Sequence, residues 1–249
     1  MNSAFKDHFS SQATDYARFR PNYPAELFAW LAGIAPARGT AWDCGTGSGQ
    51  AAVGLAAHFE RVIATDPSRK QLEHAEPHPR IDYRLAPAEV SLLDTASIDL
   101  VTVAQAIHWF DLDKFYAEAK RVLKPGGIIA AWTYTLLDVE AGIDELLTDF
   151  YRNVVGPYWP PERRMVDDRY RSLLFPFESI EPPAFEIRTE WSRDDLLGYL
   201  GTWSATQACM KAKGVDPLVE FGRRLAALWP DPGMKKTLRW PLHLRVGRT

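Results

Sequence analysis

The chain has 249 residues, of which 46% are apolar and 24% charged, and its net charge is −3. This length allows one large α/β domain or two small ones, with enough apolar residues for a buried core. Because binding to polyanions depends on clustered Lys and Arg, the slightly negative charge argues against a nucleic-acid partner. Cys44 and Cys209 lie far apart and match no metal-ligand spacing, so neither a metal site nor a disulfide framework is expected.

The sequence also indicates where the protein acts. Residues 2–8 lack the apolar run of a secretion signal, and the most apolar segment, 126–137, is too short and too polar at its end to cross a bilayer. We therefore expect a cytoplasmic protein with no membrane partner, either as a monomer or as a homodimer.

Strands and helices alternate over residues 24–135. Pro24 begins a helix over 25–34, and a buried strand over 40–44 leads through a glycine-rich turn into a helix over 50–59. Further strands are predicted over 61–66, 81–85, 98–103 and 128–134, and further helices from Ser68 to about 75 and over 111–123. This alternation predicts right-handed βαβ units and a parallel sheet with helices on both faces.

The remaining residues follow another pattern. Residues 136–184 contain one helical run, 139–154, and then a segment rich in Pro and aromatic residues. A strand over 185–191, two or three helices between 193 and 229, and a strand over 236–246 come next, which predicts an antiparallel addition to one sheet edge. Pro241 predicts an edge position or a bulge, because a central strand needs that N–H group. No repeat or linker divides the chain, so we expect a single domain.

The segment from Asp43 to Gln50, Asp-Cys-Gly-Thr-Gly-Ser-Gly-Gln, joins the first strand to a helix. Its alternate glycines let the main chain turn sharply and approach a ligand beside the N–H groups of a helix N-terminus. Gln50 stands where the dinucleotide fingerprint has its third glycine. Asp43 would repel a pyrophosphate, whereas it can accept a hydrogen bond from an amine or lie near a sulfonium. The segment therefore favours S-adenosylmethionine (SAM) over NAD.

This segment resembles motif I of the class I SAM-dependent methyltransferases. Asp66, 23 residues after Asp43, resembles the acidic residue that binds the ribose in that family; Ala88-Glu89 resembles the segment beside the adenine, and residues 124–127 resemble the turn before the fifth strand. The patterns at 16–24, 104–111 and 240–241 are similar to the type 11 branch, which includes trans-aconitate methyltransferases.

The resemblance implies a fold and a division of the chain. The fold is α/β and Rossmann-like, with a seven-stranded, mostly parallel sheet, an antiparallel edge strand and a helical insert. The division is a lid segment over 1–23, a SAM-binding core over 24–135, a substrate-side insert over 136–184, and strands and helices over 185–249 that complete the sheet, all within the single domain 1–249.

The resemblance also implies the site residues. Those expected at the cofactor are Tyr16, Arg20, Asp43, Gly45, Thr46, Gly47, Gly49, Gln50, Asp66, Pro67, Ala88, Glu89, Gln105 and Ala106. Those expected at the methyl acceptor are His108, Trp109, Tyr134, Tyr158, Trp159 and Arg163, with Arg164 a further candidate. For the residues from Tyr134 onward, ordinary packing or a solvated charge is the alternative.

The expected reaction is transfer of the SAM methyl group to an oxygen of a small acid or hydroxyl compound, with S-adenosylhomocysteine as the second product. His108 is the candidate catalytic residue: it could orient the acceptor or take a proton from it. Two alternatives stay open from the sequence. One is a SAM-binding module without catalysis, and the other is an NAD(P)-dependent oxidoreductase.

Overall fold

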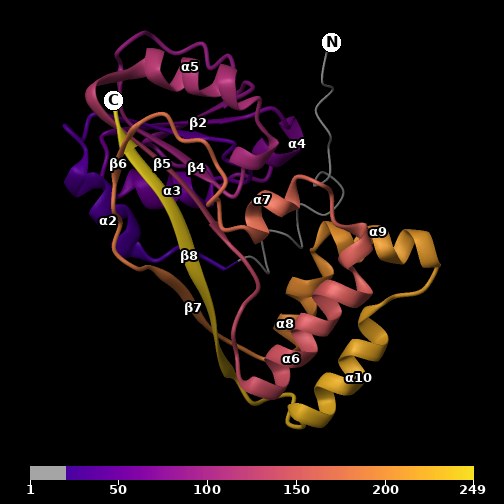
Figure 1. The fold of residues 1–249 in the computed structure, drawn as a ribbon. Coiled ribbons are helices and arrows are strands. Elements are labelled where there is room, and N and C mark those ends of the chain that lie inside the picture. Colours follow the sequence, from indigo (N-terminus) through magenta and orange to yellow (C-terminus); the bar gives the residue numbers. More distant parts are fainter. Residues whose placement is uncertain (1–20) are drawn as a thin grey trace.

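The computed structural model describes residues 21–249, and Tyr16 and Arg20 lie outside this range (Figure 1). Its first half alternates helices and strands in this order: α2 (Ala25–Ile34), β1 (Thr40–Cys44), α3 (Gln50–Ala56), β2 (Arg61–Asp66), α4 (Arg69–Leu72), β3 (Ile81–Leu85), β4 (Ile98–Ala104), the 3-10 turn η1 (Ile107–Trp109), α5 (Leu112–Val122) and β5 (Leu123–Tyr134). The five strands run parallel to one another. The predicted βαβ organisation is confirmed.

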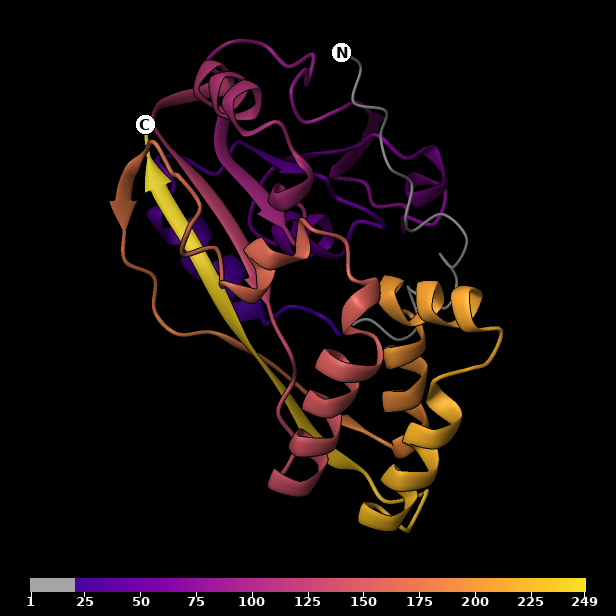
Figure 2. The ribbon, with the colours of Figure 1, turned by 45° about the vertical axis from the view of Figure 1, so that its right-hand side comes forward.

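The second half adds a group of helices and the other edge of the sheet. Its elements are α6 (Ala141–Asp149), the π-helical turn η2 (Phe150–Val154), the 3-10 turn η3 (Gly156–Tyr158), α7 (Arg163–Asp167), β6 (Glu178–Ile180), β7 (Glu186–Trp191), α8 (Arg193–Gly201), α9 (Ser204–Lys213), α10 (Leu218–Leu228) and β8 (Lys236–Arg248). Helix α10 packs against α6 and α8, and α9 packs against η3. These helices gather beyond one end of the sheet, away from α5 (Figures 1 and 2).

The sheet has the order β3-β2-β1-β4-β5-β8-β6, and β7 also pairs with β8. Strand β8 is antiparallel to β5, and both β6 and β7 are antiparallel to β8. Because β6 and β7 share one partner strand and are separated only by residues 181–185, which include Pro182 and Pro183, they form one interrupted edge strand. Counted in this way, the sheet has the seven strands that the sequence predicts.

The position of Pro241 differs from the prediction. Strand β8 lies inside the sheet, between β5 and the β6/β7 edge, so the expected edge position is wrong. Pro241 pairs with Glu186 of β7, and the pairing with β5 begins one residue later, at Leu242 opposite Tyr134. On the side of β5, the proline thus lies in the irregular stretch between the Arg239–Asp138 bridge and the first β5 pair at Leu242, and there its missing N–H group is tolerated.

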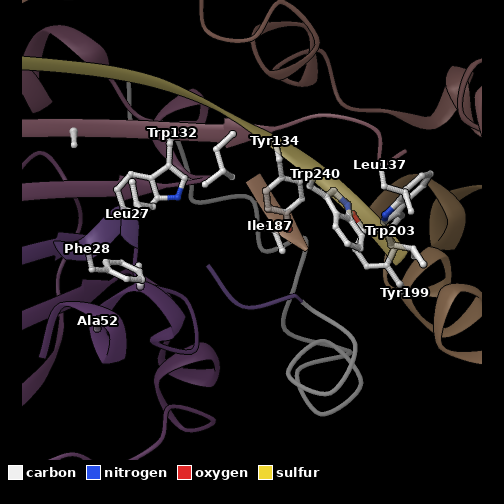
Figure 3. Packing of buried hydrophobic residues seen from close by; sticks show 14 of the residues in the cluster. Leu27, Phe28, Ala52, Trp132, Tyr134, Leu137, Ile187, Tyr199, Trp203 and Trp240 are labelled. Atoms are coloured by element: carbon white, nitrogen blue, oxygen red, sulfur yellow. The ribbon is translucent and has the colours of Figure 1, made fainter. Parts of the chain in front are cut away.

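Two apolar clusters cover the two faces of the sheet. Successive side chains of a strand point to opposite faces, so Ala41 of β1 packs with α2 and α3, while its neighbour Trp42 packs with α5. The first cluster continues from Trp132 through Trp240 to Tyr199 and Trp203 in the helical group (Figure 3). The sheet and the helical group therefore share a core. Among the described helices, none is long and apolar enough to cross a membrane.

Local sequence signals explain most element boundaries. The Ser68 hydroxyl accepts a hydrogen bond from the Gln71 N–H group and caps α4, and the Asp111 carboxylate accepts one from the Lys114 N–H group and caps α5. The helix predicted over 139–154 is instead α6 followed by the π-helical turn η2. Helices α3 and α4 each end three residues earlier than predicted.

Candidate active site

The turn after β1 depends on its glycines. Gly45, Gly47 and Gly49 have φ angles of 69°, 57° and 87°, which are left-handed values that side chains disfavour. A Cβ atom on Gly45 would lie 2.7 Å from Cβ of Ala106, and one on Gly49 would lie 2.4 Å from the Tyr83 hydroxyl oxygen. Gly45 therefore lets the loop after β4 approach, and Gly49 makes room for Tyr83. At Gly47 the space beyond the Cα atom is open, and a ligand could enter it.

Asp43 is the next-to-last residue of β1, and its carboxylate is fully buried. Its oxygens accept hydrogen bonds of 2.5 Å from the Thr46 hydroxyl and 2.8 Å from the Thr102 hydroxyl. Burial raises its pKa to about 6 in spite of these bonds, and the charge of Asp66 adds to the rise. A cation beside it would stabilise the ionised form and lower the pKa. The site thus holds a negative charge that favours a positively charged ligand.

Asp66 stands at the matching end of β2. Its carboxylate accepts hydrogen bonds of 2.9 Å from the Gly47 N–H group and 2.8 Å from the Ser68 N–H group. The carboxylate therefore ties the glycine turn to the start of α4. Pro67 follows in a half-buried position, and Gln50, also half-buried, begins α3.

A residue that the sequence analysis did not single out lies next to this turn. Gln71 of α4 is 6% exposed, and within the described part of the chain its Oε1 atom has no hydrogen-bond partner. That oxygen lies 3.9 Å from the place that a Cβ on Gly47 would occupy. A buried polar atom without a partner costs free energy. The amide oxygen and the open space at Gly47 fit a ligand that brings hydroxyl or amino donors, such as the ribose and adenine of SAM.

The loops after β3 and β4 complete this side of the site. Ala88 is buried, and the Glu89 carboxylate accepts a hydrogen bond of 2.9 Å from the Asp111 N–H group at the start of α5. Gln105 has a φ of 54°, a strained value for a residue with a side chain, and strain of this kind often marks a functional site. Ala106 is the residue that Gly45 allows to approach.

Beyond the carboxyl ends of β4 and β5 lies a cavity of about 60 Å³. The residues that line it are Gln105, His108, Trp109, Tyr134, Trp159, Pro160, Arg163, Tyr199, Trp203 and Ser204. Half of these residues are Trp or Tyr, and such walls exclude water while a few polar groups fix the orientation of a ligand. The cavity therefore has the character of a binding site for a small molecule.

His108 is a titratable group of this cavity whose surroundings strongly change its pKa. Burial, and to a lesser extent the charge of Arg163, lowers its pKa to about 3, so the ring is neutral at pH 7. The Nδ1 atom lies 2.9 Å from the hydroxyl oxygen of Tyr170. A neutral imidazole offers one donor nitrogen and one acceptor nitrogen, and the Tyr170 contact occupies one of the two.

Arg163 brings a positive charge to the same wall. Its guanidinium carbon lies 4.6 Å from the ring centroid of Trp159, and its Nε group donates a hydrogen bond of 2.9 Å to the Tyr151 hydroxyl. Nε also lies 3.5 Å from a carboxylate oxygen of Asp167. Stacking on an aromatic face and a hydrogen bond fix the orientation of the guanidinium. The cavity therefore combines a fixed cation with a neutral imidazole.

Five of the expected acceptor residues, together with Gln105, line the cavity; the five are His108, Trp109, Tyr134, Trp159 and Arg163. Tyr158 is not among the lining residues and lies instead beneath the ammonium group of Lys213, and Arg164 is exposed. The lining residues absent from the sequence predictions are Pro160, Tyr199, Trp203 and Ser204. The sequence does contain Gly201-Thr202, which breaks the helical pattern between Tyr199 and Trp203. This break could have indicated Tyr199, Trp203 and Ser204 as residues of the cavity.

Comparison with known proteins identifies the family. A family model described as a methyltransferase domain matches residues 42–131. A protein of Dictyostelium discoideum named as a methyltransferase is 38% identical over 225 residues, which cover 89% of this chain and 86% of that protein. The chain belongs to the SAM-dependent methyltransferases. A solved structure from Anaeromyxobacter dehalogenans, described as a type II methyltransferase, is 49% identical with a TM-score of 0.87 over 92% of this chain and 97% of that one.

The family assignment decides between the alternatives that the sequence left open. The protein is a class I methyltransferase that uses SAM, and the oxidoreductase and the non-catalytic module are set aside. A Haemonchus contortus phosphoethanolamine N-methyltransferase bound to S-adenosylhomocysteine shares the fold, with 17% identity and a TM-score of 0.50 over 100% of this chain and 61% of that one. Within residues 21–249, no group of three or more His, Cys, Asp or Glu side chains is placed to hold a metal ion.

Proposed function

We propose that this methyltransferase transfers the methyl group of SAM to an oxygen of a small carboxylate or hydroxyl compound, held in the cavity beyond β4 and β5. The observation that carries the proposal is the composition of that cavity, in which aromatic side chains surround His108, Gln105 and Arg163. The proposal includes a cytoplasmic location, a monomer or homodimer, and an acceptor other than nucleic acid. The net charge of −3 supports this last point.

The residues that would hold SAM are those around the glycine turn. Asp43 supplies a negative charge, Gly47 an open approach, and Asp66 and Gln71 oxygen atoms that can accept hydrogen bonds from the ribose and adenine. SAM supplies an activated methyl group on a sulfonium. Because that group is already reactive, the protein mainly has to align the acceptor and exclude water. Tyr16 and Arg20 stay predictions for the same ligand.

Two polar groups of the cavity suit the two acceptor classes. The fixed guanidinium of Arg163 favours a carboxylate, because ion-paired hydrogen bonds to carboxylates are stronger than neutral ones. An ionised carboxylate needs no base before it is methylated. A hydroxyl acceptor has a proton to lose, and the neutral ring of His108 is the polar group that could contact it.

The test is methyl transfer from isotope-labelled SAM to a panel of small carboxylic acids, their amides, phenols, alcohols and amines. We expect methyl esters or ethers as products. The variant Arg163→Gln should raise KM for the best acid about 10-fold or more, from the loss of a charge-assisted hydrogen bond. Arg164→Gln, which removes the neighbouring exposed charge, is the matched control and should leave KM unchanged.

Binding of S-adenosylhomocysteine, followed by isothermal titration, separates acceptor recognition from cofactor recognition. Arg163→Gln should bind this ligand as the parent enzyme does. Methylation of amines alone, with no acid or hydroxyl compound accepted, would overturn the proposed acceptor class while leaving the family assignment intact.

A further inference from the structure

Two aromatic rings hold Arg163 in the wall of the cavity. Its guanidinium carbon lies 4.6 Å from the ring centroid of Trp159 and 5.6 Å from that of Tyr151, and the two rings are 5.2 Å apart. Its Nε group also donates a hydrogen bond of 2.9 Å to the Tyr151 hydroxyl oxygen. Trp159 and Arg163 line the cavity, whereas Tyr151 is not among the lining residues. Tyr151 therefore contacts Arg163 from behind the wall.

The hydrogen bonds at the Tyr151 hydroxyl have a fixed direction. The hydroxyl donates its one hydrogen to a carboxylate oxygen of Asp167. An arginine Nε group can only donate and an ionised carboxylate can only accept, so the Tyr151 oxygen must accept from Arg163 while its hydrogen points to Asp167. Burial raises the pKa of Tyr151, so the hydroxyl keeps this hydrogen at neutral pH. The hydroxyl thus fixes the Nε end of the guanidinium.

The other end of the guanidinium is free to bind a ligand. Within residues 21–249, neither Nη1 nor Nη2 of Arg163 makes a hydrogen bond, and the ion pair with Asp167 is formed by Nε, at 3.5 Å. The Arg163 side chain is 21% exposed. Arginine carries its N–H groups in a rigid, flat fork that matches the two oxygens of a carboxylate. The orientation of this fork is therefore set before a ligand arrives.

A second donor without a partner belongs to the same wall. The indole N–H group of Trp159 is buried, and it has no hydrogen-bond partner among the residues that the structure describes. A buried donor left unpaired costs free energy, and a ligand that brings acceptor oxygens can offset this cost. Two neighbouring residues of the wall thus offer unpaired donors, which suits an anion better than an amine.

We propose that Tyr151 is a positioning residue, which holds Arg163 so that its two Nη groups bind both oxygens of a carboxylate on the methyl acceptor. This assignment rests on the proposed function. A carboxylate offers an acceptor oxygen to each N–H group, whereas an amide offers one oxygen and brings donors of its own, and an ammonium group is repelled. Arg163 therefore selects acceptors that carry a carboxylate.

The contacts of Arg163 can be followed without any methyl transfer. We suggest ¹H–¹⁵N spectra of the full chain labelled with ¹⁵N, at pH 6 and low temperature with S-adenosylhomocysteine present, with the Arg163 signals assigned by their loss in Arg163→Gln. Acetate and benzoate should shift the Nη signals and leave the Nε signal nearly in place, while acetamide and benzamide should shift neither. A shift of Nε alone, or no shift with either anion, overturns the proposal.

Tyr151→Phe tests the positioning role, because it keeps the ring beside Trp159 and removes only the hydroxyl. The dissociation constant of acetate and KM for the best acid should each rise about 5-fold, the value of one hydrogen bond to a charged group. KM for an acceptor with a hydroxyl and no acid group, and kcat for both, should change by less than about 2-fold. A purely structural role would affect both kinds of acceptor alike. Equal changes for the two, or an unchanged affinity for acetate, overturn the proposal.

Tyr158→Phe is the matched control. Tyr158 belongs to η3, its ring lies beneath the ammonium group of Lys213, and it is not among the residues that line the cavity. Loss of its hydroxyl should leave the affinity for acetate unchanged. A loss equal to that in Tyr151→Phe would mean that the packing of this region alone orients Arg163, and it would overturn the proposal.

Arg163→Lys serves as a second variant, which is decisive should Tyr151→Phe fail to fold. It keeps the positive charge but has no fork, so it should lose affinity for acetate as Arg163→Gln does. Affinity like that of the parent would mean that charge alone suffices, and it would overturn the proposal. If amines alone are methylated while acetate still shifts the Nη signals, the proposed acceptor class fails and the carboxylate site at Arg163 stands.

Discussion

The hydroxyl of Thr102 on β4 donates a hydrogen bond of 2.8 Å to the carboxylate of Asp43 on the neighbouring strand β1. This bond and the one from Thr46 hold the carboxylate in place, yet its pKa is still raised to about 6 because burial outweighs them. The free enzyme therefore carries an acid that is unfavourable to ionise. A cationic ligand offsets this cost, which ties the stability of the free protein to its affinity for SAM.

The first prediction concerns Asp43→Asn. In the unfolded chain the carboxyl has its ordinary pKa of 3.8. Between pH 3.8 and about 6 the folded protein keeps a proton that the unfolded chain has released, so stability falls as pH rises through this window and stays lower above it. Since one pKa unit corresponds to about 1.4 kcal/mol, ionisation of Asp43 costs the free protein roughly 3 kcal/mol of stability at pH 7.5, and Asp43→Asn should remove this pH-dependent cost.

Urea denaturation at pH 7.5 and at pH 4 measures this effect. Relative to the parent, Asp43→Asn should be roughly 2–3 kcal/mol more stable at pH 7.5 than at pH 4. Its affinity for S-adenosylhomocysteine should fall at least about 10-fold at pH 7.5. Asp82→Asn is the control, because Arg84 lowers the pKa of that exposed carboxyl and its removal should not stabilise the protein. An equal gain from Asp43→Asn at both pH values would contradict the assignment.

The sequence predicts the cofactor half of the molecule well because its signals are local. Strands β2 and β3 have the predicted limits, since Pro67 and other breakers bound these two short segments. Asp43 and Asp66 are likewise found at strand ends beside the glycine turn. In this region the residues that determine the structure and those proposed to bind the ligand are neighbours in the sequence.

The acceptor side could not be predicted in the same way. Tyr170 reaches His108 from 62 residues away. Tyr199 of α8 and Trp203, which directly precedes α9, enter the cavity from a region that the sequence predicts only as two or three helices. The short strand β6 has only three residues and shows no alternation. Such contacts depend on tertiary packing, for which a single sequence gives no spacing rule.

The second prediction concerns Gln71→Met. Methionine fills a similar volume and removes an amide whose oxygen, within residues 21–249, has no hydrogen-bond partner. The free protein should therefore be as stable as the parent or slightly more stable, while affinity for S-adenosylhomocysteine should fall about 5- to 10-fold, the value of one hydrogen bond. Thermal unfolding and isothermal titration give the two numbers.

Gln207→Met provides the comparison for that variant. The Gln207 amide donates a hydrogen bond of 2.8 Å to the Gly201 carbonyl, so its loss should lower stability without an effect on ligand affinity. If Gln71→Met behaves in the same way, Gln71 has a structural role only.

The third prediction concerns the loss of folding stability at acidic pH that follows from the lowered pKa of His108. Burial lowers its pKa from 6.5 to about 3, so below pH 6.5 the unfolded chain binds a proton that the folded protein does not. Stability should fall as pH decreases from 6.5 toward 3, by about 2 kcal/mol at pH 5. His108→Asn should abolish this part of the pH dependence in urea denaturation at pH 7.5 and pH 5.

A second variant checks the physical cause. Arg163→Gln removes a nearby positive charge and should raise the pKa of His108, which reduces the loss of stability at pH 5. Because burial is the larger cause, most of the loss should remain. A His108→Asn protein with the same pH dependence as the parent would show that His108 already binds a proton in the folded state.

The fourth prediction separates the two roles of the glycines. Gly45→Ala places a Cβ 2.7 Å from that of Ala106 in a left-handed conformation and should cost roughly 2–4 kcal/mol of stability. The double variant with Ala106→Gly removes the collision and should recover part of that loss. A Gly45→Ala protein of unchanged stability, measured by urea denaturation, would contradict the observed approach of the two loops.

Gly47→Ala should behave differently, because the space at that position is open and only the backbone strain, about 1 kcal/mol, opposes the change. Its added methyl group would instead enter the space beside Gln71 and lower affinity for S-adenosylhomocysteine at least about 10-fold. Gly214→Ala, at the end of α9, has a similar φ of 69° and nothing within 4 Å, so it should cost as much stability without an effect on affinity. Equal affinities of these two variants for S-adenosylhomocysteine would mean that the space at Gly47 is not where the cofactor lies.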